Sequence, residues 1–595
     1  MLHRLLVLVF LFFSLAHFGQ NEQLAQNYFD SGAFEKALLS YQELLKNQPG
    51  NNNYFLRMVE CYQQLEQYDK AEKEISERLL KYKQATLLIE LGYNYQLQKN
   101  TTKAESLYEE AILKINEAPT NVYSVAATFE KKVLLNYALR AYETAFAIDP
   151  KARFNYQMGL LYGQLGQPDK MIDKFLDELY TNPQNSVLIQ NQLSRFMNDD
   201  TDGQFNNQLR KALLVRAQQN QDIYWNQMLS WFYVQQKDYG KAFIQEKAIY
   251  KREPESFSNI VSLGELAIED NEEELAKEIF TFILENTNDL DLQIQSHYYL
   301  MKMQIEKALP KEYPQIDANL ELLLKKYGVS PYTLSLQLMQ ANFATFKRNN
   351  PEQGKAILER TMALPLNRFQ MADAKMELAD ILLFENKFNQ ALIYYSQIQE
   401  DLKNDVIGHE ASLKAAKTSY FNIDFDWALS QLKVLKSAST QLIANDALEL
   451  FLLINDNTVA DSTQTALKLF AKADFLMYQN KKEEALKQFQ AILKDHQSED
   501  DVIADVTLLR LGELYEALRD IPKALESYQN IIDNFPESIY RDEALYFSAE
   551  IYHKNLQLPD KAKALYEALL FNHQDSIYFV DARKKYRLLR GDSNL

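Results

Sequence analysis

Small and aromatic residues recur along this chain at a fixed phase. Near the N-terminus, small or apolar residues follow one another at intervals of 34, 33, 34 and 33, at Ala37, Ala71, Ala104, Ala138 and Met171. Another small or apolar residue stands twelve positions before each of them, and an aromatic residue follows it by three, giving Ala25, Val59, Gly92, Ala126 and Gly159, then Tyr28, Tyr62, Tyr95, Phe129 and Tyr162. This spacing predicts two helices per repeat.

The period weakens in the middle of the chain and returns near its end. Residues 184–220 and 290–355 lack the signature, although Ala242 and Ala276 are again 34 apart. Weaker units are predicted around Ala391 and Ala428. Toward the C-terminus the intervals lengthen to 39 and 38, which indicates longer connections, at Ala485, Ala524 and Ala562.

The pattern resembles the tetratricopeptide repeat, a helix-turn-helix unit. One unit carries Gly92, Tyr95, Ala104, Tyr108 and Ala111 in the positions of the family pattern. Only glycine or alanine fits where two helix backbones approach closely, and the aromatic residues fill the space beside them. The resemblance implies an all-α fold, an alpha-solenoid in which antiparallel helix pairs stack into a right-handed superhelix. The run NFPESIYRDEALYFSAEIY also resembles tetratricopeptide modules of bacterial envelope proteins.

The N-terminal segment has the three parts of a secretory signal peptide. Arg4 precedes an apolar run from Leu5 to Leu15, and small residues follow. Cleavage after Ala16 and cleavage after Gly19 both remain open. We therefore expect export to the periplasm or cell envelope, or secretion, with no membrane span after cleavage. The predicted organisation is a signal peptide, an N-terminal repeat array, degenerate helical repeats, weaker repeats and a C-terminal array, at residues 1–19, 20–183, 184–330, 331–460 and 461–595.

Composition narrows the possible functions. Glycine and proline number only 15 and 14, which favours long helices over hairpins and phosphate-binding loops. The net charge of −18 would repel phosphate backbones, so a nucleic-acid partner is not expected. Cys61 is the single cysteine, so no internal disulfide can form. We interpret it as a small packed apolar residue on a helix. The oligomeric state stays open.

No catalytic or metal-binding motif stands out. The chain has no G-x-S-x-G elbow, no P-loop and no H-E-x-x-H. Residues Asn198 to Gly203 match the first half of a calcium loop, but Leu209 stands where its bidentate glutamate belongs. A helix-connecting turn with capping aspartates is the favoured interpretation. We therefore predict no enzyme activity, no cofactor and no metal site.

The resemblance also implies a binding face. In tetratricopeptide arrays the first helices line a concave groove, and carrying over their groove positions gives Gln26, Gln63, Ile89, Tyr93, Gln96, Tyr123, Tyr156 and Leu160. Tyrosine and glutamine suit an extended peptide or a partner helix, although the tyrosines could instead pack between neighbouring units. The sequence thus predicts a non-catalytic scaffold for protein-protein interaction or complex assembly in the envelope. A glycan- or nutrient-capture accessory protein and an enzyme with a site in the degenerate middle are the alternatives.

Overall fold

The computed structural model confirms an all-helical fold. It describes residues 21–200, 203–254, 257–438, 441–460, 463–496 and 503–591, and no strand occurs among them. The predicted signal peptide lies outside these residues. The chain divides into two compact units, residues 1–229 and 230–595, with the boundary inside α13 (Ile223–Gln235). The four internal boundaries predicted from the sequence stay predictions.

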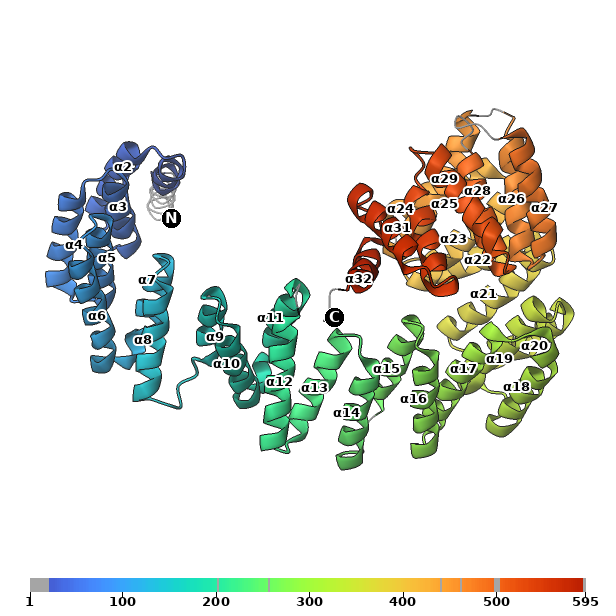
Figure 1. Ribbon diagram of the computed structural model, residues 1–595, viewed down its shortest axis with the longest axis horizontal. Helices are drawn as coiled ribbons and strands as arrows, with labels where there is room; N and C mark the ends of the chain where they lie inside the picture. The colour runs from blue at the N-terminus through green and yellow to red at the C-terminus, as the bar shows by residue number, and fades with distance from the viewer. Residues whose placement is uncertain are drawn as a thin grey trace, which may run out of the picture. The chain divides into compact units, whose positions relative to one another are not determined.

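Unit 1 consists of successive antiparallel helix pairs (Figure 1). Residues 21–30 are helical and precede the first labelled helix. The helices that follow are α2 (Phe34–Asn47), α3 (Asn52–Gln64), α4 (Tyr68–Tyr82), α5 (Ala85–Leu97), α6 (Thr101–Glu117), α7 (Val122–Lys131), α8 (Leu135–Ile148), α9 (Asn155–Gln164), α10 (Pro168–Thr181), α11 (Ser186–Asp199) and α12 (Gln204–Gln219).

Unit 2 continues the same pairing of helices. Its first half holds α14 (Tyr239–Arg252), α15 (Ser258–Glu269), α16 (Glu273–Asn286), α17 (Leu290–Lys307), α18 (Tyr313–Tyr327), α19 (Leu334–Asn342), α20 (Pro351–Met362), α21 (Arg368–Phe384) and α22 (Phe388–Asp401). Its second half holds α23 (Val406–Phe421), α24 (Phe425–Ala438), α25 (Gln441–Ala460), α26 (Thr465–Tyr478), α27 (Lys482–Asp495), α28 (Ala504–Ala517), α29 (Ile521–Asn534), α30 (Arg541–Glu550), α31 (Pro559–Asn572) and α32 (Phe579–Arg590).

The recurring small residues occupy one structural position. Each predicted residue from Ala37 to Ala562 is the fourth residue of the second helix of its pair and is fully or almost fully buried. Five residues earlier, the turn between the two helices adopts the left-handed conformation, for example at Glu66, Val133 and Ile423. The predicted period therefore marks a repeated helix-turn-helix unit.

Glycines in the first helices show why small residues are needed. A Cβ added at Gly92 would lie 2.6 Å from Cε1 of Tyr108, and one added at Gly512 would lie 2.2 Å from Cε1 of Tyr528. Gly159 faces Phe175 at 2.5 Å in the same way. The aromatic ring of each second helix therefore lies directly against the backbone of the first, as the sequence pattern predicts.

The structure shows how one region without the sequence signature is organised. Residues 331–355 belong to a regular pair, because Gly354 is the fourth residue of α20 and Asn349 has the left-handed turn conformation. A π-helical turn at Phe343–Lys347 inserts an extra residue, so the close contact joins Gly354 to the carbonyl of Ala341, thirteen positions earlier. A search at a spacing of twelve misses this repeat.

Candidate binding groove

The N-terminal face predicted from the resemblance is largely occupied by contacts within the chain. Gln63 is 6% exposed, and Ile89 is fully buried, so Ile89 belongs to the core and offers no accessible side chain. Gln26 and Gln96 accept hydrogen bonds from the hydroxyls of Tyr41 and Tyr108 at 3.1 and 2.8 Å.

The three predicted groove tyrosines also have partners within the chain. The ammonium of Lys132 lies 4.8 Å from the ring centre of Tyr93, and the half-buried ring of Tyr156 packs against Phe175. Tyr123 is 56% exposed, with one edge against Phe154, while Leu160 is half-buried. Of the predicted tyrosines, Tyr123 is the one that presents most of its surface to solvent.

A buried ion pair lies at the centre of this face. Nζ of Lys132 is 3.0 Å from a carboxylate oxygen of Glu90 and 3.6 Å from one of Glu60, and the side chains of Lys132 and Glu90 are only 8% and 5% exposed. Desolvation alone would lower the pKa of Lys132, but the two carboxylates outweigh it and raise the pKa. Lys132 therefore holds α3, α5 and the end of α7 together.

Unit 2 carries a row of cavities along its first helices. Cavities of about 830, 760, 670 and 690 Å³ follow one another from α15 to α23. Neighbouring cavities share lining residues, among them Gln295, then Tyr298, then Asn342. We call this row the groove. The cavities that are accessible on unit 2 thus lie in the middle of the chain, where the repeat signature of the sequence is weakest.

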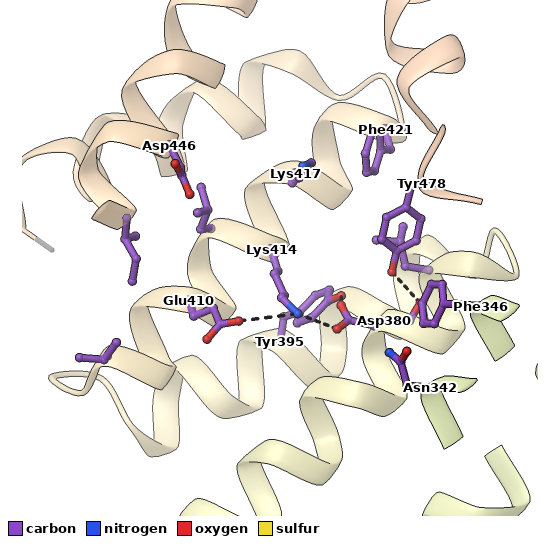
Figure 2. A pocket seen from close by; sticks show the side chains of 14 residues that line it. Asn342, Phe346, Asp380, Tyr395, Glu410, Lys414, Lys417, Phe421, Asp446 and Tyr478 are labelled. Carbon is purple, nitrogen blue, oxygen red and sulfur yellow. Dashed lines mark hydrogen bonds and ion pairs between the residues drawn. The ribbon is translucent and has the colours of Figure 1, made fainter. Parts of the chain in front are cut away.

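The cavity of about 690 Å³ has a polar floor and aromatic walls (Figure 2). Asp380 accepts hydrogen bonds from the Tyr395 hydroxyl at 2.5 Å and from the Lys414 ammonium at 2.6 Å. Glu410 lies 3.8 Å from the same ammonium. These bonds leave Asp380 and Lys414 mutually neutralised.

An element distant in the sequence closes one wall of this cavity. The hydroxyl of Tyr478, at the end of α26, donates to the backbone carbonyl of Asp380 at 2.9 Å, and its ring lies 5.7 Å from that of Phe346. The side-chain amide of Gln479 donates to the carbonyl of Phe384 at 2.6 Å. The end of α26 is therefore anchored to α21, which gives this wall a fixed position.

Glu377 is the unusual group of the adjoining cavity of about 670 Å³. It lies on α21 one turn after Asp373, and its carboxylate accepts a hydrogen bond from the Asn342 amide at 2.9 Å. Burial raises the pKa of Glu377 to about 7, with Asp380 adding to the shift and Asn342 and Lys414 opposing it. Burial, reinforced by Glu410, also raises the pKa of Asp373. The groove therefore contains a recessed carboxylate that binds a proton more readily than usual.

Replacing Glu377 with glutamine is expected to stabilise the protein in a pH-dependent way. The folded pKa lies above the ordinary value, so the wild-type protein loses stability as the pH rises through about 7, whereas the variant does not. Denaturation by urea should show a gain on the order of 1–3 kcal/mol at about pH 8 and almost none at about pH 5. The same substitution at the exposed Glu359 is the control. Equal effects at both pH values would contradict this account.

Sequence reasoning missed the charged residues of the groove. Asp373, Glu377 and Asp380 recur at helical spacing on α21, whose remaining positions are mostly buried and apolar. The available signal was a row of acidic residues on one side of an otherwise mostly apolar helix. A helix face that contacts only water is rarely bordered by so many apolar residues. The family positions carried over earlier covered only the N-terminal units.

The other candidate sites are weaker. Asp200 accepts a hydrogen bond from the backbone amide of Asn206 at 2.8 Å and so caps the start of α12, as the turn interpretation expects. In the described part of the chain no cluster of histidine, cysteine and acidic residues has the arrangement of a metal site. Within the same ranges, no helix combines the length and apolar character needed to cross a membrane.

Comparison with known proteins then identifies the repeats. Residues 507–538, which form most of α28 and α29, match the family model described as tetratricopeptide repeat. They include the close contact between Gly512 and Tyr528. This segment of the chain is therefore a tetratricopeptide repeat. The groove helices α15, α17, α19, α21 and α23 are likewise first helices of helix pairs.

Two solved structures resemble the chain along most of its length. The Naa15/Naa10 complex bound to HypK-THB is 12% identical, covers 97% of each chain and has a TM-score of 0.30. The APC/C hetero-tetramer Cut9–Hcn1 is 13% identical, covers 95% of each chain and has a TM-score of 0.23. Likenesses this distant do not bear on function. No match to the chain is found among curated proteins.

Proposed function

We propose that this chain is an exported, non-catalytic scaffold that holds a segment of a partner protein in the groove of unit 2. The row of cavities along successive first helices carries the proposal. Its exposed apolar and aromatic side chains, such as Tyr332 at 75% and Val406 at 53%, offer contact area to an extended or helical segment. The N-terminal face supports it less, because its side chains already bind one another.

The chemistry of the groove favours binding over catalysis. Among the described residues that line the Glu377 and Asp380 cavities there is no histidine or cysteine. The Asp380 carboxylate already accepts hydrogen bonds from Lys414 and Tyr395, which gives it a structural role within the chain. Glu377 has a raised pKa, but the described lining residues include no histidine or cysteine nucleophile beside it. This combination supports ligand binding as the role of the cavity.

Export rests on the N-terminal segment alone. An apolar run after Arg4 followed by small residues is typical of a cleaved signal peptide. Intact-mass analysis of the protein from the envelope fraction should give a chain that has been cleaved before about residue 21 and lacks Met1. Retention of Met1 would contradict export by this route.

Serine substitutions on the groove should reduce partner capture without unfolding the protein. Changing Tyr332 and Val406 together removes exposed apolar surface from the groove, so we expect about tenfold weaker capture of the partner with an unchanged helical spectrum. Serine at Leu322 and Ile393, which are exposed on second helices, is the matched control. If alanine at Tyr93, Tyr123 and Tyr156 abolishes capture while the groove variant binds normally, the N-terminal face is the site.

A further inference from the structure

Two recessed carboxylates of the groove, Asp380 and Glu377, differ in how well they are paired with a cation. On α21, Asp380 is paired with Lys414 at 2.6 Å, whereas within the described residues Glu377 accepts a hydrogen bond from the amide of Asn342 and forms no ion pair. Lys414, whose charge does act on Glu377, is already bound by Asp380 and Glu410. A carboxylate in such a place is costly to keep ionised without a cation beside it.

The other lysines that line the groove do not place a cation beside Glu377. Lys302 and Lys417 are exposed, so water solvates their ammonium groups at little cost, and Lys347 is half-buried at the same cavity. No ion pair joins any of these three to Glu377 or Asp373 in the described chain. A ligand therefore gains more by bringing a cation to Glu377 than by bringing an anion to the exposed lysines.

The walls around Glu377 suit a long cationic side chain. Tyr298 and Tyr332 line the same cavity of about 670 Å³, together with the aliphatic side chains of Leu338 and Met339. Aromatic faces attract ammonium and guanidinium groups, and apolar walls accept the methylene stem of lysine or arginine. The lining of this cavity thus combines apolar and aromatic side chains with the carboxylates of Asp373 and Glu377.

We propose that the partner segment held in the groove is basic and apolar, and that it presents a lysine or arginine side chain to Glu377. This rests on the proposed function and specifies the chemistry of the partner. A bound cation stabilises the ionised carboxylate, so binding releases the proton that Glu377 carries in the free protein. Affinity should therefore rise with pH up to about 8 and fall by up to about tenfold per unit below pH 7.

Charged groups on every element packed around Glu377 influence how its binding of a cation depends on pH. Asp373 and Asp380 lie on the same helix as Glu377, and Asn342 faces it from α19. Glu410 and Lys414 contribute from α23, Lys347 from the π-helical turn, and Lys302 and Glu306 from α17. Of these groups, Asp373 is the other carboxylate with a raised pKa, so it adds to the proton release in the same direction.

Fluorescence anisotropy with the full chain tests the proposal. The probes are short labelled peptides in which leucine alternates with lysine, with glutamate or with glutamine. We expect the lysine peptide to bind most tightly and Glu377→Gln to weaken its binding by about tenfold or more at about pH 8. The control Glu359→Gln removes an equal charge outside the groove and should change binding little. The pH dependence should be strongly reduced in Glu377→Gln, with Asp373 accounting for what remains, and unchanged in Glu359→Gln.

Other outcomes overturn the proposal. Tighter binding of the glutamate peptide, equal losses in Glu377→Gln and Glu359→Gln, or no binding of the lysine peptide would each do so. Melting curves of both variants show whether any loss comes from unfolding. If the groove still captures its protein partner while the lysine peptide shows no preference, the inference about charge fails and the proposed function stands.

Discussion

Replacing Lys132 with methionine will lower the free energy of unfolding by about 3–5 kcal/mol at about pH 8. The substitution leaves Glu90, whose side chain is 5% exposed, without the ammonium that lies 3.0 Å from it. A charged carboxylate buried without a partner is far less stable than a paired one, and methionine fills most of the volume of lysine.

Acid should relieve most of this loss. Burial already raises the pKa of Glu90 in the wild-type protein, and Lys132 opposes that rise, so loss of Lys132 raises the folded pKa further above its unfolded value. The destabilisation is therefore present above that folded pKa and disappears as the pH falls through it. Urea denaturation of Lys132→Met, of the double variant with Glu90→Gln, and of the neighbouring exposed Lys131→Met measures the effect. The double variant should recover much of the stability, and Lys131→Met should resemble wild type. Equal losses at Lys131 and Lys132 would contradict the role of the pair.

The same glycine-to-alanine substitution will have opposite effects at two positions. At Gly512 the new Cβ would lie 2.2 Å from the ring of Tyr528, which is fully buried and donates a hydrogen bond to Glu516. We expect a loss of about 1–3 kcal/mol, because the ring cannot move without disturbing both helices. At Gly240, in α14, nothing lies within 4 Å of the added Cβ. Alanine there should raise stability by roughly 0.5–1 kcal/mol through lower unfolded-state entropy.

Thermal and urea denaturation followed by circular dichroism distinguish these two cases. Both substitutions add one methyl group to a helix, so a difference in sign reports the close approach of α28 and α29 and not helix propensity. Equal gains at Gly512 and Gly240 would show that the helices are not packed around glycine in solution.

The sequence was sufficient to predict the repeated part of the fold. Where two helices pack closely, a small residue such as glycine or alanine is usually required. Ala37, Ala104 and Ala524 therefore locate the second helices from the sequence alone, before the partner helix is known. The pair α19–α20 was missed because a π-helical turn shifts its phase by one residue. Such a turn has no fixed sequence signature, so a search for a small residue exactly twelve positions earlier misses the pair. The pair α30–α31 also contains a π-helical turn, at Ile551–Asn555, but Ala562 was found by its interval of 38 from Ala524.

The binding surface was harder to predict than the fold. Family positions locate a face, but they do not tell whether its side chains already bind one another, as Lys132 does with Glu90 and Tyr93. The Asp380 cavity depends on Tyr478, which follows Asp380 by 98 residues and reaches it only through the packing of α26 against α21. Contacts at that separation leave no local pattern in the sequence.

Site-specific photo-crosslinking tests the central claim that the groove of unit 2 holds a partner segment. A photoreactive amino acid placed at Tyr332 lies in the groove, whereas one placed at Ile393 lies on the exposed face of a second helix. In envelope extract, the account predicts one protein crosslinked at Tyr332, a much weaker product at Ile393, and less of the Tyr332 product when Val406 is changed to serine. Equal crosslinking at both positions, or crosslinking at Ile393 alone, would contradict it.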